Sequence, residues 1–151
     1  MENNEIIDTL NTLIETSRDG ENGFTTCAED VTDASLRAYF TICATRCRAS
    51  VHTLAEMVKF HGGIPEPAGT LLGPLDRAWI DLRAALSSNS DLAVLKECER
   101  AEDSALSTYH RALEKDLPPD VRALVMLQLN GVLENHDRVR KMRDEKQLHA
   151  A

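Results

Sequence analysis

Four stretches of this chain place apolar, small or occasional polar residues at alternating steps of three and four, and this spacing restricts the fold more than any other feature. The first stretch shows it in Ile7, Leu10, Ile14, Ser17, Glu21, Phe24, Ala28 and Val31. Residues at such steps form one stripe along an α-helix, and a stripe this long needs a partner helix to cover it. Gly20 and Gly23 each cost a helix interior about 1 kcal/mol, but the stripe keeps its phase through both, so we expect one helix.

Three more stripes follow along the chain. They consist of Leu36, Phe40, Cys43, Cys47, Ser50, Leu54 and Met57, then Leu92, Leu95, Glu99, Glu102, Leu106, Tyr109 and Leu113, then Val121, Val125, Gln128, Val132, Asn135, Val139 and Met142. Only 4% of the residues are aromatic, so the core must consist mainly of aliphatic side chains. This composition favours packed helices over a β-sandwich, whose strands draw on aromatic and β-branched residues. The sequence therefore predicts an all-α protein.

Local signals divide the chain into four long helices and one short helix. Gly62–Gly63 is a typical helix C-terminus, and Pro118–Pro119 ends one helix and opens the next, because proline suits a first helical turn. Asp33 and Ser90 are suitable N-cap residues. A single domain of residues 1–151 is predicted, with helices at about 4–30, 33–61, 72–87, 91–116 and 118–146.

The links between the helices predict their arrangement. Only Val31 to Asp33 separate the first two helices, which must therefore be antiparallel neighbours. The segment from Ile64 to Ser90 is long enough to return along the bundle and to carry Trp79 against it, so the next long helix runs parallel to the second. One long crossover between two antiparallel pairs is the ferritin-like connectivity of a four-helix bundle. The alternative is an up-down bundle with the short helix packed outside.

Six short motifs are spread over nearly the whole chain. They are LIET at 13–16, DGENGF at 19–24, RAWIDL at 77–82, ERAED at 99–103, DLPPDVR at 116–122 and HDRVR at 136–140. Together they resemble an uncharacterised bacterial family of ferritin-like four-helix bundles, a domain of unknown function. The resemblance implies a ferritin-like four-helix bundle with a short extra helix in the crossover between the second and third long helices. It implies no particular activity.

Charge and cysteine usage limit the partners and the location. The formal net charge of −8 repels phosphate backbones and anionic lipids, so we expect no nucleic-acid and no membrane partner. No apolar run approaches the roughly 20 residues that span a bilayer, and the acidic N-terminus differs from a signal peptide. Four cysteines without such a signal indicate reduced thiols and a cytoplasmic protein.

The stripes contain polar residues that a plain bundle does not need. Counting from the turns between helices places them at a similar height, so we expect one polar layer near mid-bundle. Its members are Glu21, Cys43, Cys47, Glu99, Glu102 and His136. Burying a carboxylate without a partner costs several kcal/mol, so such a layer requires a metal ion, arginine or shared protons.

Metal binding is one explanation of this layer. Ferritin-like di-metal sites use a Glu-x-x-His motif on each of two helices, but His52 follows Ala49 at this spacing and His136 follows Leu133. Both motifs are absent, which argues against di-iron oxidase chemistry and against an enzyme. Cys43 and Cys47, one helical turn apart, could hold copper(I) or zinc. The two glutamates of the third stripe and His136 could add ligands for a harder ion such as iron.

Structural explanations compete with metal binding. Buried cysteines often pack as small hydrophobic residues, and Arg46 and Arg48 could form buried ion pairs with Glu99 and Glu102 that fix helix register. The two arginines could also lower the pKa of Cys47 and make it a redox-sensing thiol.

Two hypotheses about function follow from the sequence. The first is a non-enzymatic, ferritin-like bundle, a homo-oligomer with a structural, interaction or stress-related role and an unknown protein partner. The second is a metal-ion-binding bundle that uses the mid-bundle layer. The absence of both Glu-x-x-His motifs favours the first.

Overall fold

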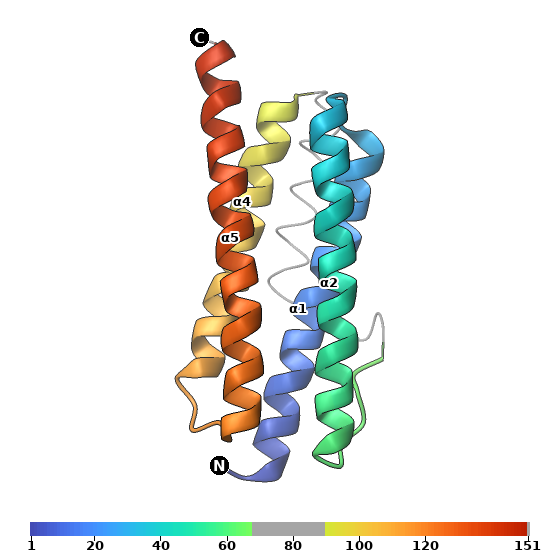
Figure 1. Ribbon diagram of the computed structural model, residues 1–151, viewed down its shortest axis with the longest axis vertical. Coiled ribbons are helices and arrows are strands. Elements are labelled where there is room, and N and C mark those ends of the chain that lie inside the picture. Colours follow the sequence, from blue (N-terminus) through green and yellow to red (C-terminus); the bar gives the residue numbers. More distant parts are fainter. Residues whose placement is uncertain (68–89, 151) are drawn as a thin grey trace.

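The computed structural model describes residues 1–67 and 90–150, which form an all-α four-helix bundle (Figure 1). The helices are α1 (Asn3–Asp30), α2 (Ala34–Phe60), α4 (Asp91–Leu113) and α5 (Pro119–Ala150). The predicted all-α fold class is therefore confirmed. The predicted short helix at 72–87, with Trp79, lies outside the described residues.

The bundle consists of two antiparallel hairpins, α1 with α2 and α4 with α5 (Figure 1). Contacts are extensive within each hairpin but sparse between α1 and α4 and sparser between α2 and α5. Figure 1 shows that α2 and α4 run in the same direction. This direction requires a long connection between the end of α2 and the start of α4, although the ferritin-like assignment itself stays a prediction.

Side-chain and backbone caps fix most helix ends. Asp33 Oδ1 accepts hydrogen bonds from the backbone nitrogens of the next helix at 2.8 and 3.1 Å, and Ser90 Oγ accepts one from Ala93 N at 3.2 Å. Gly62, with φ of 82°, ends α2 in a left-handed conformation that suits glycine. Both predicted N-caps and the predicted glycine stop are thus present.

The turn between α4 and α5 begins earlier than predicted. Helix α4 ends at Leu113 rather than near residue 116, because Arg122 of α5 reaches back to its last carbonyl groups. The Nη1 atom of Arg122 donates to Leu113 O at 3.3 Å and Nη2 donates to Lys115 O at 2.7 Å. An arginine from the next helix therefore satisfies carbonyls that a helix end leaves unpaired.

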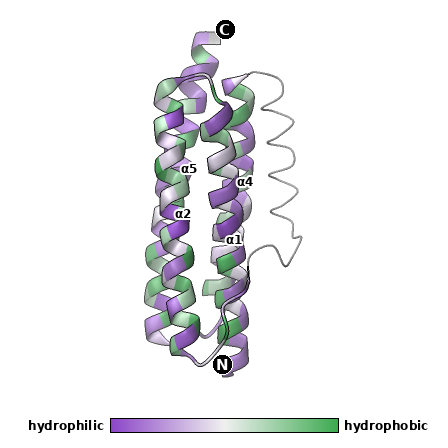
Figure 2. Ribbon diagram, turned by 90° about the vertical axis from the view of Figure 1, so that its right-hand side faces the viewer, coloured by the Kyte–Doolittle hydropathy of each residue, from purple (hydrophilic) through white to green (hydrophobic). Residues whose placement is uncertain are grey.

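The core is divided into two apolar halves along the bundle. The half near the α1–α2 turn contains Phe24 stacked on Phe40, with ring centroids 6.0 Å apart. The half near the α4–α5 turn is built around Leu10, Leu54 and Val125. Figure 2 shows apolar and polar residues alternating along the helices. None of the described helices has the length and apolar character needed to cross a membrane.

Candidate functional site

A cavity of about 350 Å³ lies at mid-height, between the two apolar halves of the core. All four described helices contribute to its lining. Its inner wall comes from α1 and α4 and includes Ser17, Gly20, Glu102, Ala105 and Tyr109. We call this region the waist cavity. Its volume lies in the range of ordinary small-molecule sites.

The waist cavity opens to solvent between α2 and α5. Arg46 and Ala49 of α2 and Leu127 and Gly131 of α5 line it and are exposed, Leu127 to 70%. These two helices make few contacts with each other. Figure 1 shows them next to one another on the side that faces the viewer. A molecule could therefore enter without separation of the hairpins.

Small residues create the space. A Cβ atom added to Gly131 would meet no other atom within 4 Å, so this position leaves room at the mouth. Gly20 has the opposite role, because a Cβ atom there would lie 2.9 Å from Cys47 Sγ. Glycine at this position lets α1 approach α2 closely, while Ala49 on α2 and Ala105 on α4 add only small side chains to the lining.

Hydrogen bonds hold most polar groups of the cavity wall. The Tyr109 hydroxyl donates to Gln128 Oε1 at 2.9 Å and lies 3.5 Å from Ser17 Oγ. Asn135 Oδ1 accepts a hydrogen bond from the Tyr39 hydroxyl at 2.9 Å and from Arg46 Nη1 at 3.4 Å. These side chains therefore form a rigid polar wall.

Glu102 is the exception on this wall. Its residue surface is only 4% exposed, and neither carboxyl oxygen has a hydrogen-bond partner within the described part of the chain. Burial raises the pKa of Glu102 well above its ordinary value, and the negative charges of Asp103 and Glu99 raise it further. The carboxyl group therefore holds its proton at pH values where an exposed glutamate is ionised.

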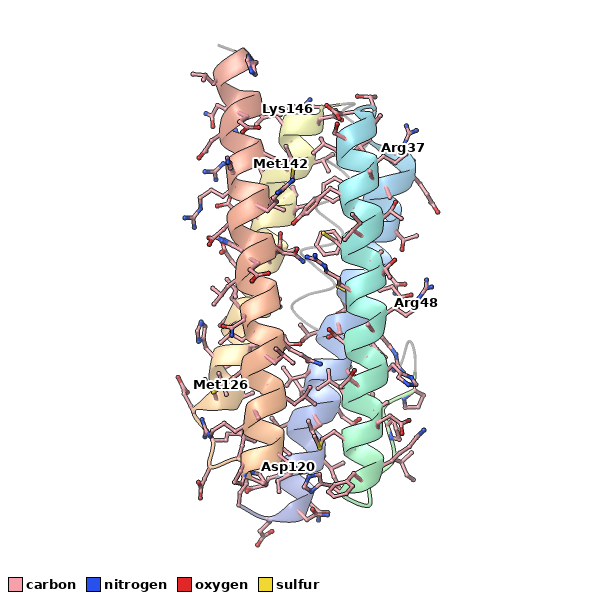
Figure 3. The ribbon with its side chains drawn as sticks, in the orientation of Figure 1. Arg37, Arg48, Asp120, Met126, Met142 and Lys146 are labelled. Atoms are coloured by element: carbon pink, nitrogen blue, oxygen red, sulfur yellow. The ribbon has the colours of Figure 1, made fainter. Side chains whose placement is uncertain are left out.

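The other predicted acidic ligand positions are occupied by ion pairs. Glu21 Oε1 lies 2.8 Å from Arg48 Nε, and Figure 3 shows Arg48 projecting outward from α2. Glu99 pairs with Arg143, and its Oε1 lies 3.6 Å from Arg140 Nε. The expected pairing of the α4 glutamates with Arg46 and Arg48 is therefore wrong. The arginine partners of Glu99 come from α5, because the side of α4 that carries Glu99 faces α5.

His136 is buried on α5 and contacts α4. Its Nε2 atom lies 2.6 Å from Asp103 Oδ1, an acidic partner that the stripes did not single out because Asp103 lies outside them. The imidazole is thus engaged with an exposed carboxylate on the neighbouring helix. It does not line the waist cavity.

Cys43 and Cys47 both lie close to Glu102. Cys43 is fully buried, with Sγ 3.8 Å from Asn135 Oδ1, and Cys47 lines the waist cavity. Burial raises the pKa of each thiol to about 12. The idea that Arg46 and Arg48 lower the pKa of Cys47 is therefore wrong, and its thiol is not activated.

The six predicted ligands do not converge on one point. Within residues 1–67 and 90–150, no three histidine, cysteine, aspartate or glutamate side chains gather closely enough to hold a metal ion. Only Glu102 and Cys47 line the same cavity. The side chains present therefore do not fit a ferritin-type di-metal centre, which needs carboxylates and histidines from four helices directed at one point.

Sequence reasoning missed the cavity itself. Tyr109 and Gln128 were visible as polar members of their stripes, but nothing marked them as one wall. The sequence did contain one signal for the cavity. Three helices each carry a small residue that lines it, and these residues are Ala49, Ala105 and Gly131. A cavity is a property of facing helices, so no single stripe reveals it.

Comparison with known proteins identifies the family. No curated protein matches the chain. A family model covers residues 5–115, most of the chain and three of the four described helices. The expected membership of a family without an assigned function is confirmed, whereas its bacterial and ferritin-like character stays predicted. The chain belongs to the family described as Domain of unknown function (DUF2383).

Proposed function

We propose that this protein is a non-enzymatic helical bundle that acts by binding, and that it holds a small organic molecule at its waist. One observation carries the proposal: a cavity of about 350 Å³ interrupts the core at mid-height and opens between α2 and α5. The space is concave, reaches the buried wall of α1 and α4, and is lined mostly by apolar side chains with a few polar groups. Small-molecule sites have this character.

The state of the lining residues supports binding rather than catalysis. The Cys47 thiol, with its raised pKa, is a poor nucleophile. Tyr109 is hydrogen-bonded to Gln128, and burial raises its pKa to about 12. Most of the remaining inner wall is apolar or small, as in sites that bind through shape.

A binding titration tests this proposal directly. We choose 2-phenylethanol, a neutral molecule with an apolar ring and one hydroxyl group, and follow it by two-dimensional NMR. Saturable shifts at cavity residues are expected. The double variant Ala49→Leu/Ala105→Leu, which fills the cavity from two sides, should weaken binding at least tenfold.

A matched double variant controls for the added leucines. Ala38 of α2 and Ala123 of α5 are exposed and lie outside the lining. Ala38→Leu/Ala123→Leu should bind as the natural protein does. Equal affinity of both double variants would contradict the proposed function.

Metal-ion binding is the second candidate, and its support is the presence of Glu102 and Cys47 in one cavity with Cys43 beside them. Elemental analysis after reconstitution with iron, zinc and copper(I) tests it. A stoichiometric ion that is lost in Glu102→Ala and Cys43→Ser would support it, and substoichiometric metal in the natural protein would exclude it.

We further propose a cytoplasmic homo-oligomer. Apolar side chains on the outer face of α5 support self-association, since Met126 and Leu133 are 50% and 37% exposed. Light scattering coupled to size-exclusion chromatography measures the mass, and a monomer at micromolar concentration would count against it.

A further inference from the structure

Among its described lining residues, the waist cavity contains one carboxyl group, and this group has no hydrogen-bond partner. Glu102 is 4% exposed, lines the cavity, and finds no partner for either oxygen in the described part of the chain. A buried carboxyl group in this state bears the cost of losing its water contacts without hydrogen bonds that would offset it. The other polar side chains around it, such as Tyr109 and Asn135, already have partners. A bound guest molecule could therefore supply the hydrogen-bond partner that Glu102 lacks.

The charges around Glu102 favour a positively charged guest. The groups that interact electrostatically with it are Glu99, Asp103 and Cys98 on α4 and Tyr39, Cys43 and Cys47 on α2. All of these are acids, but Glu99 is paired with Arg143 and Arg140, and Asp103 lies against His136. The described lining residues of α1 and α5 include no titratable side chain. Apart from Arg46, every titratable group among the described lining residues is thus an acid, so an ionised Glu102 favours a cation over an anion in the cavity.

Arg46 is the only basic residue among the described lining residues. It is exposed at the mouth, and its Nη1 atom donates to Asn135 Oδ1 at 3.4 Å. The pKa of Glu102 is shifted by burial, Asp103 and Glu99, and not by the positive charge of Arg46. Arg46 therefore lies at the entrance, and Glu102 is the only carboxyl group among the described lining residues.

We propose that the guest of the waist cavity is a small amine with an apolar body, and that the carboxyl group of Glu102 receives its ammonium group. This assignment rests on the proposed function, which it narrows to one chemical class. The ammonium supplies hydrogen-bond donors to both carboxyl oxygens, and the apolar body packs against residues such as Phe24, Leu124 and Val132.

Binding of the amine changes the protonation state of Glu102. The free protein holds a proton on Glu102, and the free amine is an ammonium ion at neutral pH. When the ammonium binds, the carboxyl O–H bond breaks, its electron pair stays on oxygen as carboxylate, and the proton leaves to the buffer. One amine bound therefore releases one proton, so long as the pH lies below the raised pKa of Glu102.

Three probes of similar size distinguish the head groups. They are 2-phenylethylamine, 2-phenylethanol and 3-phenylpropanoate, titrated into the full chain at pH 6 by isothermal calorimetry. The amine should bind at least tenfold more tightly than the alcohol, and the carboxylate should bind most weakly. Equal affinity for amine and alcohol, or tightest binding of the carboxylate, would overturn the assignment while leaving the proposed function intact. No binding of any probe would overturn both.

The variant Glu102→Gln keeps the shape and removes the charge. It should lose the preference for the amine over the alcohol. Glu134→Gln, on the exposed surface of α5, is the matched control and should keep the preference. A preference for the amine that survives in Glu102→Gln would overturn the role of Glu102.

Proton release gives a second readout that does not depend on a variant. Calorimetry of the natural protein in two buffers of different ionisation enthalpy measures the protons released per molecule bound. The expected release approaches one for the amine and zero for the alcohol. Amine binding without proton release would overturn the proposal.

Discussion

Replacing Glu102 by Gln should change how the stability of the bundle depends on pH. The pKa of this carboxyl group is raised in the folded protein, mainly by burial, and returns to about 4.3 in the unfolded chain. Between these two values the folded state holds one proton more than the unfolded state. The free energy of unfolding therefore falls by about 1.4 kcal/mol for each pH unit gained in this interval.

Glutamine cannot ionise, so the variant lacks this decline. The stability difference between Glu102→Gln and the natural protein should grow in favour of the variant by about 1.4 kcal/mol per pH unit, or about 2.7 kcal/mol over two units. The growth stops at the folded-state pKa of Glu102. The pH at which the two stability profiles become parallel is therefore the pKa of Glu102 in the folded protein.

Urea unfolding at half-unit steps from pH 4.5 to 8.5, followed by circular dichroism, measures both profiles. Glu134→Gln controls for the loss of a carboxylate, because this residue is exposed on α5. Its difference from the natural protein should stay constant over this range. A constant difference for Glu102→Gln as well would refute the reasoning, because it would show that Glu102 is ionised and hydrated in the folded protein.

Three further substitutions or treatments test other contacts. Glu99→Gln removes the charge that pairs α4 with two arginines of α5 and should cost about 1–3 kcal/mol in urea unfolding. Oxidation should join Cys27 and Cys98, whose sulfur atoms lie 3.7 Å apart at a separation of 71 residues. Closing this loop should stabilise the chain by about 4 kcal/mol, measured as a higher melting temperature that reductant reverses. Gly20→Ala places a Cβ atom 2.9 Å from Cys47 Sγ and should destabilise the bundle by about 1–3 kcal/mol despite better helix propensity, a loss that adding Cys47→Ala should reverse.

Each of these tests has an outcome that contradicts it. A stability for Glu99→Gln equal to that of Glu134→Gln would show that the α5 ion pairs contribute nothing. Oxidative stabilisation that persists in Cys98→Ala would exclude the Cys27–Cys98 bond. If Gly20→Ala proves more stable than the natural protein, the close approach of α1 to α2 is absent.

The helices and their order could be predicted because they depend on local chemistry and on the spacing of apolar residues. The stripe through Leu10, Ile14 and Phe24 gave α1 its length, and Asp33 and Gly62 marked the ends of α2. Such signals act within one helix or one turn, so the chain shows them without knowledge of its partners.

The partners of the polar side chains were decided only by the tertiary structure. Glu99 and Glu102 are three residues apart on one helix, yet Glu99 meets the arginines of α5 and Glu102 faces the waist cavity without a partner. Their contacts differ because the two side chains point roughly 60° apart around the helix. The rotation of α4 about its own axis determines which neighbour each side chain contacts. The sequence places both glutamates in a polar layer. Only the packing of four helices creates the cavity and leaves the carboxyl group of Glu102 in its wall without a partner in the described part of the chain.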